Sequence, residues 1–184
     1  MIGDEFARVL AAAQGGSEAD FARLWRDVNP VLLRYLRATA PAAAEDITAE
    51  TWVQVVRGLP GFRGDEQAWR AWLFTTARRR TADEARHRSR HPVAPLAELP
   101  GALEPRTEDA AGQAVENLAT ASAIAAVSAL PRLQAEVVLL RVLAGLDTDA
   151  VARIVGRSPG AVRVAAHRGL RRLAQTLAKP GVTL

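Results

Sequence analysis

The segment from residue 44 to residue 90 constrains the fold most, because it predicts two amphipathic helices joined by a short loop. In the first helix, Ile47, Thr51 and Val55 recur at the four-residue spacing of a buried face. The loop, residues 58–64, contains three glycines and a proline, which are typical of a break between helices. This part of the chain is therefore predicted to be helical.

Composition favours the same architecture for the whole chain of 184 residues, 49% of which are hydrophobic. Ala, Leu, Val and Arg are frequent and alternating β-branched runs are few, so we predict an all-α fold. The chain has no cysteine, and its three histidines, His87, His91 and His167, lack the partners of a metal site or a catalytic triad. We expect no metal, no cofactor and no catalytic residues.

The N-terminus lacks the pattern of a signal peptide, and no apolar run approaches the length of a membrane span. We therefore expect no membrane insertion and a cytoplasmic protein. Residues 4–13 predict a short helix, and Ser17 is a candidate N-cap for the next one. Pro30 interrupts that second helical pattern, so a kink or a break is predicted there.

The C-terminal third predicts a helix-turn-helix. Leu130-Pro131 opens one helix, Asp147 caps a short second helix, and Ser158-Pro159 starts a last helix that runs to about residue 177. One face of the last helix is apolar, formed by Val162, Ala165, Ala166, Gly169, Leu173 and Leu177. The opposite face carries Gly160, Arg163, Val164, His167, Arg168 and Arg171 and suits the major groove of DNA.

Charge is distributed unevenly along the chain, whose formal net charge is +4. Residues 1–91 hold 14 basic and 12 acidic residues, residues 92–127 hold 1 and 5, and residues 128–184 hold 9 and 3. The acidic, proline-containing stretch 92–118 is predicted to be a flexible linker. The basic C-terminal block suggests a polyanion partner, although a solvated arginine-rich surface gives the same count.

Two surfaces of the N-terminal part are candidates for binding. Six arginines between residues 78 and 90 make a positive helix end that suits phosphate and bases. On the preceding helix Asp46, Glu50, Val53 and Arg57 share one outward side, which from the residues alone is an ordinary solvated face.

The ordered set of residues resembles the extracytoplasmic-function (ECF) sigma factors, a class of bacterial transcription initiation factors. Region 2 is matched by Ala44-Glu45-Asp46-Ile47-Thr48-Ala49-Glu50-Thr51, Phe62-Arg63, Ala71-Trp72-Leu73-Phe74, Ala77-Arg78 and Asp83. Region 4 is matched by Leu130-Pro131, Gly145-Leu146, Ala152, Gly156, Gly160-Ala161-Val162-Arg163, His167-Arg168 and Leu170-Arg171-Arg172-Leu173.

The resemblance implies two small helical domains, residues 1–91 and 119–184, in an alternative sigma factor that is a monomer when free. It implies RNA polymerase core and promoter DNA as partners, and an anti-sigma factor as the regulator that members of this family often have. Core polymerase would contact Asp46, Glu50, Val53 and Arg57. The −10 element would contact Gly61, Phe62, Arg63, Arg78, Arg79, Arg80 and Arg86. The −35 element would contact Arg157, Ser158, Gly160, Arg163, Val164, His167, Arg168, Arg171 and Arg172.

Other functions stay open at this point. A sigma-like decoy would bind an anti-sigma factor without initiating transcription, and a stand-alone helix-turn-helix repressor would bind duplex DNA without polymerase. An enzyme of nucleic-acid metabolism has no nucleophile, metal cluster or phosphate loop to support it. A membrane-surface role for the last helix is opposed by its alanine-rich apolar face, which would anchor poorly.

Overall fold

The structure is a computed structural model that describes residues 1–90 and 122–177. Every regular element in these two ranges is helical, which confirms the predicted all-α fold there. The predicted linker, residues 92–118, lies outside the described residues. None of the described helices is both long and apolar enough to cross a membrane.

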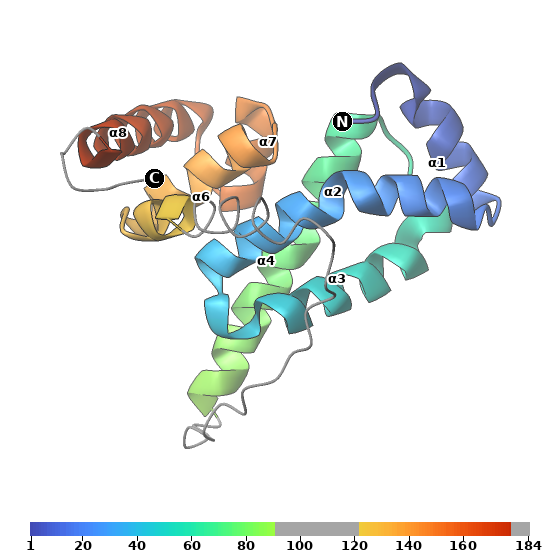
Figure 1. The fold of residues 1–184 in the computed structure, drawn as a ribbon, viewed down its shortest axis with the longest axis horizontal. Coiled ribbons are helices and arrows are strands. Elements are labelled where there is room, and N and C mark those ends of the chain that lie inside the picture. Colours follow the sequence, from blue (N-terminus) through green and yellow to red (C-terminus); the bar gives the residue numbers. More distant parts are fainter. Residues whose placement is uncertain (91–121, 178–184) are drawn as a thin grey trace, which may run out of the picture.

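The helices form an N-terminal and a C-terminal unit (Figure 1). The N-terminal unit contains α1 (Phe6–Gln14), α2 (Glu18–Thr39), α3 (Ala44–Gly58) and α4 (Glu66–Arg90). Turns of 3-10 helix, Gly3–Glu5, Pro41–Ala43 and Leu59–Gly61, precede α1, α3 and α4. The C-terminal unit contains a helical stretch at residues 122–128, then α6 (Arg132–Val138), α7 (Thr148–Val155) and α8 (Pro159–Leu177).

Helix α2 is the central element of the N-terminal unit, because it packs against α1, α3 and α4. Leu24, Val28 and Leu32 recur along it every four residues and are fully buried. The helix begins where predicted, since the Ser17 hydroxyl accepts a hydrogen bond from the Asp20 amide at 3.3 Å.

Pro30 does not break α2, which continues to Thr39, so that part of the prediction is wrong. Pro30 has no amide hydrogen to donate to the carbonyl four residues earlier. Because Pro30 is exposed, water can solvate that carbonyl instead. Val28 and Leu32 lie on either side of it and are buried in the same core. Tertiary packing thus outweighs a local cost of about 3 kcal/mol for an interior proline.

The first helix of the helix-turn-helix changes its winding before it ends. Residues Leu139–Leu143 form a π-helical turn after α6, where an uninterrupted α-helix was predicted. The Arg141 guanidinium donates a hydrogen bond of 2.5 Å to the Leu146 carbonyl and so braces the chain after this turn. Leu140 within the turn and Leu146 after it are completely buried, which ties this part of the chain to the core.

The remaining boundaries of the helix-turn-helix are as predicted. The Asp147 carboxylate accepts from the Ala150 amide at 2.7 Å and caps α7. Gly156 ends α7 in the left-handed conformation, with φ of 65°, which glycine adopts without steric cost. The Ser158 hydroxyl then accepts from the first turn of α8.

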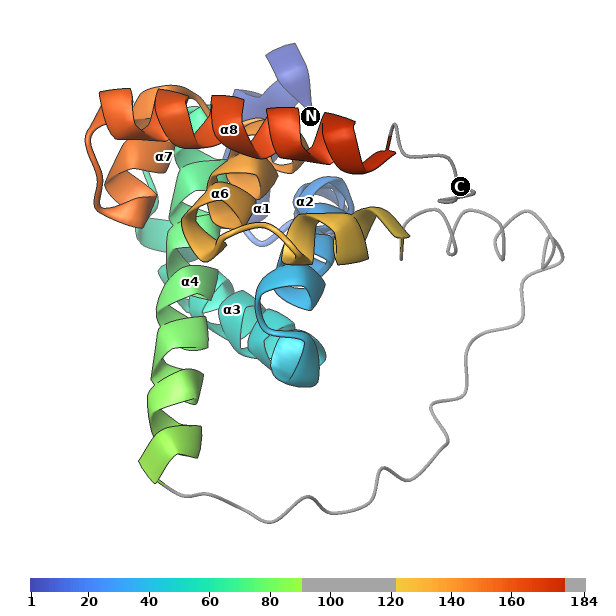
Figure 2. The same ribbon diagram turned by 90° about the vertical axis from the view of Figure 1, so that its left-hand side faces the viewer.

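The two units share one buried core. Its apolar cluster includes Leu36 and Phe74 of the N-terminal unit together with Leu140 and Val151 of the C-terminal unit. Helix α4 packs against α7, and α2 packs against the π-helical turn; Figure 2 shows α7 beside the first half of α4. Contacts between the units therefore involve apolar side chains as well as the polar groups described below.

Candidate nucleic-acid interface

Helix α8 presents a basic face to solvent. Val162 and Ala165 are buried against the C-terminal unit, whereas Arg163, His167 and Arg168 are exposed. The other residues predicted for contact with duplex DNA are exposed as well: Arg157, Ser158, Gly160, Val164, Arg171 and Arg172. The structure thus gathers all of these residues on and just before one helix, with the expected side turned outward.

Close packing against α6 sets the position of α8. A Cβ atom at Gly169 would come within 2.7 Å of a Val138 methyl group, so only glycine lets the two helices approach this closely. Arg172 donates a hydrogen bond of 3.2 Å to the Gln134 side chain and adds a polar contact beside this point. The exposed face is therefore carried by a helix that is fixed from behind.

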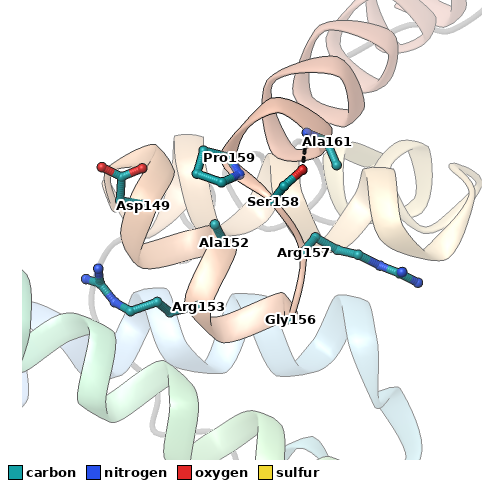
Figure 3. A pocket seen from close by; sticks show the side chains of 8 residues that line it. All are labelled: Asp149, Ala152, Arg153, Gly156, Arg157, Ser158, Pro159 and Ala161. Atoms are coloured by element: carbon teal, nitrogen blue, oxygen red, sulfur yellow. Dashed lines mark hydrogen bonds between the residues drawn. The ribbon is translucent and has the colours of Figure 1, made fainter.

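The turn before α8 forms an open hollow of about 700 Å³. Its lining residues are Asp149, Ala152, Arg153, Gly156, Arg157, Ser158, Pro159 and Ala161 (Figure 3). Figure 3 shows the side chains of Arg153 and Arg157 extending in opposite directions from the turn. Helix N-termini and nearby cations favour anions, so this end of α8 suits a backbone phosphate.

The end of α4 forms a second charged surface. A hollow of about 410 Å³ is lined by Glu50 of α3 together with Arg80, Asp83, Glu84, Arg86, His87 and Arg90 of α4. Arg86 pairs with Asp83 at 2.6 Å, and Arg88 pairs with Glu84 at 3.1 Å. The structure therefore places Glu50, predicted for polymerase contact, beside Arg80 and Arg86, predicted for DNA contact.

Arg78 does not join that surface but faces the C-terminal unit. Its Nε donates to Oε1 of Glu136 at 2.5 Å, and the Tyr35 hydroxyl lies 3.4 Å from the same oxygen. Burial is the main cause that raises the pKa of Tyr35, and the nearby Glu136 carboxylate is the second. Both keep the hydroxyl protonated. Periodicity did not predict a buried glutamate here, because Glu136 lies among the apolar residues Ala135, Val137 and Val138 of α6.

Arg70 makes a second contact between the units, and this contact was not predicted from the sequence. Only 4% of its surface is exposed. Its Nη1 pairs with Asp27 at 2.6 Å, and its Nε donates to the Ala144 carbonyl at 2.9 Å. The available signal was its position between Trp69 and Leu73, which face the core.

The loop between α3 and α4 is held by aromatic packing and by hydrogen bonds. Phe62 stacks on Trp72 with ring centroids 5.1 Å apart and meets the edge of Trp69 at 5.6 Å. Both tryptophans are thus structural, as predicted, and Phe62 packs with them. Arg63 is exposed and donates to the carbonyls of Pro60 and Phe62 at 3.0 and 2.7 Å.

Two further features of this loop concern its backbone. Gly61 is exposed, with no heavy atom within 4 Å of the position of an added Cβ. Gln14 of α1, which the sequence analysis did not single out, donates to the carbonyls of Leu59 and Phe62. The loop is therefore open on its outer side and bonded to α1 on its inner side.

The outer face of α3 matches the sequence prediction. Asp46, Glu50 and Arg57 are exposed, and Val53 is 48% exposed. Val56 is 52% exposed and extends the apolar part of this face beyond the predicted residues. Among the described residues, no group of three or more His, Asp or Glu side chains is placed to hold a metal ion.

Comparisons with known families match both parts of the chain. The family model of Sigma-70 region 2 matches residues 21–91, and that of Sigma-70 region 4 matches residues 121–173. The ECF RNA polymerase sigma factor ShbA of Streptomyces griseus is 34% identical over 180 residues, which cover 91% of this chain and 92% of that protein.

A second relative and a solved structure give the same result as these family models. The ECF RNA polymerase sigma factor SigL of Mycobacterium tuberculosis is 36% identical over 180 residues, covering 96% of this chain and 99% of that protein. The sigma factor RpoE from Bartonella quintana, solved in complex with the anti-sigma factor NepR, has the same fold, with a TM-score of 0.62, 20% identity, and coverage of 88% and 98% of the two chains. The chain belongs to the ECF RNA polymerase sigma factors and is a transcription initiation factor, not an enzyme.

Proposed function

We infer that this alternative sigma factor directs RNA polymerase core to specific promoters by dividing recognition between its two units. The N-terminal domain, residues 1–91, binds core polymerase and the −10 element, and the C-terminal domain, residues 119–184, binds the −35 element. The observation that carries this proposal is the outward basic face of α8, which ends a complete helix-turn-helix.

Arg163 and His167 lie one turn apart on this face, where side chains of a recognition helix reach base edges. Arg157 and Ser158, at the hollow before the helix, are placed for phosphate. Arg168, Arg171 and Arg172 surround this centre, with Gly160 and Val164 allowing close approach. Phosphate contacts fix the position of the helix, and base contacts give the sequence preference.

The outer face of α3 is the proposed docking surface for core polymerase. Asp46 and Glu50 supply negative charge that steers association with a basic partner surface. Val53 and its neighbour Val56 supply exposed apolar area, and Arg57 lies at the far end. An exposed apolar patch edged by charge is typical of a protein interface.

The loop and the end of α4 are proposed to bind the unpaired −10 strand. Gly61 allows backbone approach, Phe62 shapes the loop through its stacking, and Arg63 lies at its exposed edge. Arg79, Arg80 and Arg86 supply positive charge for the strand. Arg78 joins them only when its bond to Glu136 is broken.

Family membership also implies the setting in which the chain works. We propose that it acts as a monomer in the cytoplasm, where polymerase and promoter DNA are found. An anti-sigma factor that covers the polymerase-facing surface is the class of regulator expected for it.

Reconstitution with core polymerase tests the function. Run-off transcription from genomic fragments should give defined start sites with the wild-type chain. The variant with Arg163, Arg168 and Arg171 changed to Ala should still bind core but lose promoter preference. A chain that binds an anti-sigma factor yet yields no transcript with core would instead be a decoy.

A further inference from the structure

The backbone of the loop between α3 and α4 is bonded to a residue outside the matched regions. Gln14, the last residue of α1, donates from its Nε2 to the Leu59 carbonyl at 2.8 Å and to the Phe62 carbonyl at 2.9 Å. These two carbonyls belong to the first residue of the 3-10 turn Leu59–Gly61 and to the residue just after it, and Pro60 and Gly61 within the turn are exposed. One side-chain amide thus bridges both ends of the turn.

The bonds of Gln14 add something that aromatic packing does not supply. Stacking on Trp72 fixes the ring of Phe62, but the exposed backbone at Gly61 has no side chain through which it can be held. The Phe62 amide closes the turn on the Leu59 carbonyl at 3.1 Å, and Gln14 donates a second hydrogen bond to that same carbonyl. A loop ordered before binding loses less conformational entropy when its ligand arrives.

We propose that Gln14 is a positioning residue for base readout at the −10 element. It holds the carbonyls of Leu59 and Phe62 so that Gly61 and Arg63 meet the unpaired strand in one conformation. This inference rests on the proposed function of the loop. It also extends promoter recognition to α1, which precedes the region 2 match at residues 21–91.

Geometry allows the role of Gln14 to be separated from folding. The packing of α1 depends on Phe6, Val9, Leu10 and Ala13, which are buried, whereas Gln14 is half-buried. Gln14→Met keeps the length of the side chain but removes both donors. Gln14→Lys keeps a flexible stem and restores N–H donors that reach the same carbonyls.

The experiment uses holoenzyme assembled from core polymerase and the full chain, with a panel of promoters that carry each base at each −10 position. Gln14→Met should reduce discrimination about tenfold at the one or two positions that face the loop, as expected from the loss of two hydrogen bonds. Gln14→Lys should restore most of it. Gln67→Met is the matched control, because the Gln67 Nε2 donates at 3.1 Å to the Gly145 carbonyl of the C-terminal unit rather than to the loop.

Unchanged base preference in Gln14→Met would overturn the inference, and so would an equal loss on every promoter together with a lower melting temperature. If Gln14→Met does not fold, Gln14→Ala replaces it and the same comparison with Gln14→Lys decides. Failure of the wild-type holoenzyme to show any −10 preference would instead overturn the proposed function of the loop, which is a separate result.

Discussion

The basic face of α8 and the basic end of α4 use the same residue type but differ in how much of their charge is already neutralised. In the parts of the chain that the structure describes, Arg163, Arg168 and Arg171 of α8 make no ion pair. At the basic end of α4, residues 78–90, three arginines are paired with acids: Arg78 with Glu136, Arg86 with Asp83, and Arg88 with Glu84.

This difference predicts that the two surfaces would lose different numbers of existing ion pairs on binding DNA. In the proposed complex, the face of α8 would offer its full charge to a duplex, whereas Arg78, Arg86 and Arg88 of α4 would each exchange a carboxylate for the phosphate that they gain. Exposed pairs contribute only about 0–1 kcal/mol, so Arg86 and Arg88 exchange easily. Arg78 is bonded to a buried glutamate, and releasing it leaves that carboxylate without its strongest partner. Only the surface on α4 therefore depends on the contact between the units.

The largest effect is expected from breaking the contact between the two units at Arg70. Arg70→Met leaves Asp27 and the Ala144 carbonyl without this donor, so the free energy of unfolding should fall by about 3 kcal/mol. Denaturant unfolding measures it. Arg86→Met makes the same change in an exposed pair and should cost less than about 1 kcal/mol. Equal losses in the two variants would show that the buried pair is not special.

The surface on α8 is tested by comparing Arg163 with Arg172. Arg163→Ala should relax preference at one or two −35 positions by about 1–3 kcal/mol, because the side chain can reach base edges. Arg172→Ala should weaken all sequences alike and lower the salt slope by about one unit. Competition binding of the holoenzyme at several salt concentrations separates these results. The reverse pattern would mean that the helix sits differently in the groove.

A smaller effect is expected when Glu136, which would compete with DNA for Arg78, loses its charge. Glu136→Gln removes the negative charge but keeps the side-chain size, so the free chain should bind single-stranded DNA about fivefold more tightly. Glu84→Gln makes the same change in the exposed pair with Arg88 and should alter binding less than about twofold. Fluorescence anisotropy with a labelled strand gives both values. Equal gains would remove the proposed distinction between the two pairs.

The smallest effects are expected for the exposed acids of α3. Asp46→Lys and Glu50→Lys should each weaken core binding by about 0.5 kcal/mol, mainly through slower association. Because Glu50 also faces Arg80 and Arg86, only its variant should change binding of single-stranded DNA. Association kinetics and circular dichroism are measured together. An unchanged association rate in a folded double variant would exclude this face as the docking surface.

Sequence patterns predicted the features of this fold that depend on neighbouring residues. The caps at Ser17, Asp147 and Ser158 and the two faces of α8 follow from side chains a few positions apart. The continuity of α2 through Pro30 was not predicted, because distant packing decides it.

The missed site residues have a similar cause. Gln14 bonds to carbonyls 45 and 48 positions away, and Arg70 bonds to one 74 positions away. Glu136 meets Arg78 across 58 positions. Periodicity within a helix holds no information on such partners, so the local pattern assigned Arg78 to DNA without indicating its second role.

The continuous core has a consequence for how the chain unfolds. Leu36 and Phe74 share their buried cluster with Leu140 and Val151, so neither unit can lose its structure without exposing apolar surface on the other. Heating the free chain should therefore give one cooperative transition, with equal calorimetric and van't Hoff enthalpies. A fragment ending at residue 91 should melt at a lower temperature than the whole chain and aggregate more readily, because the surface left bare is the one that the second unit covers.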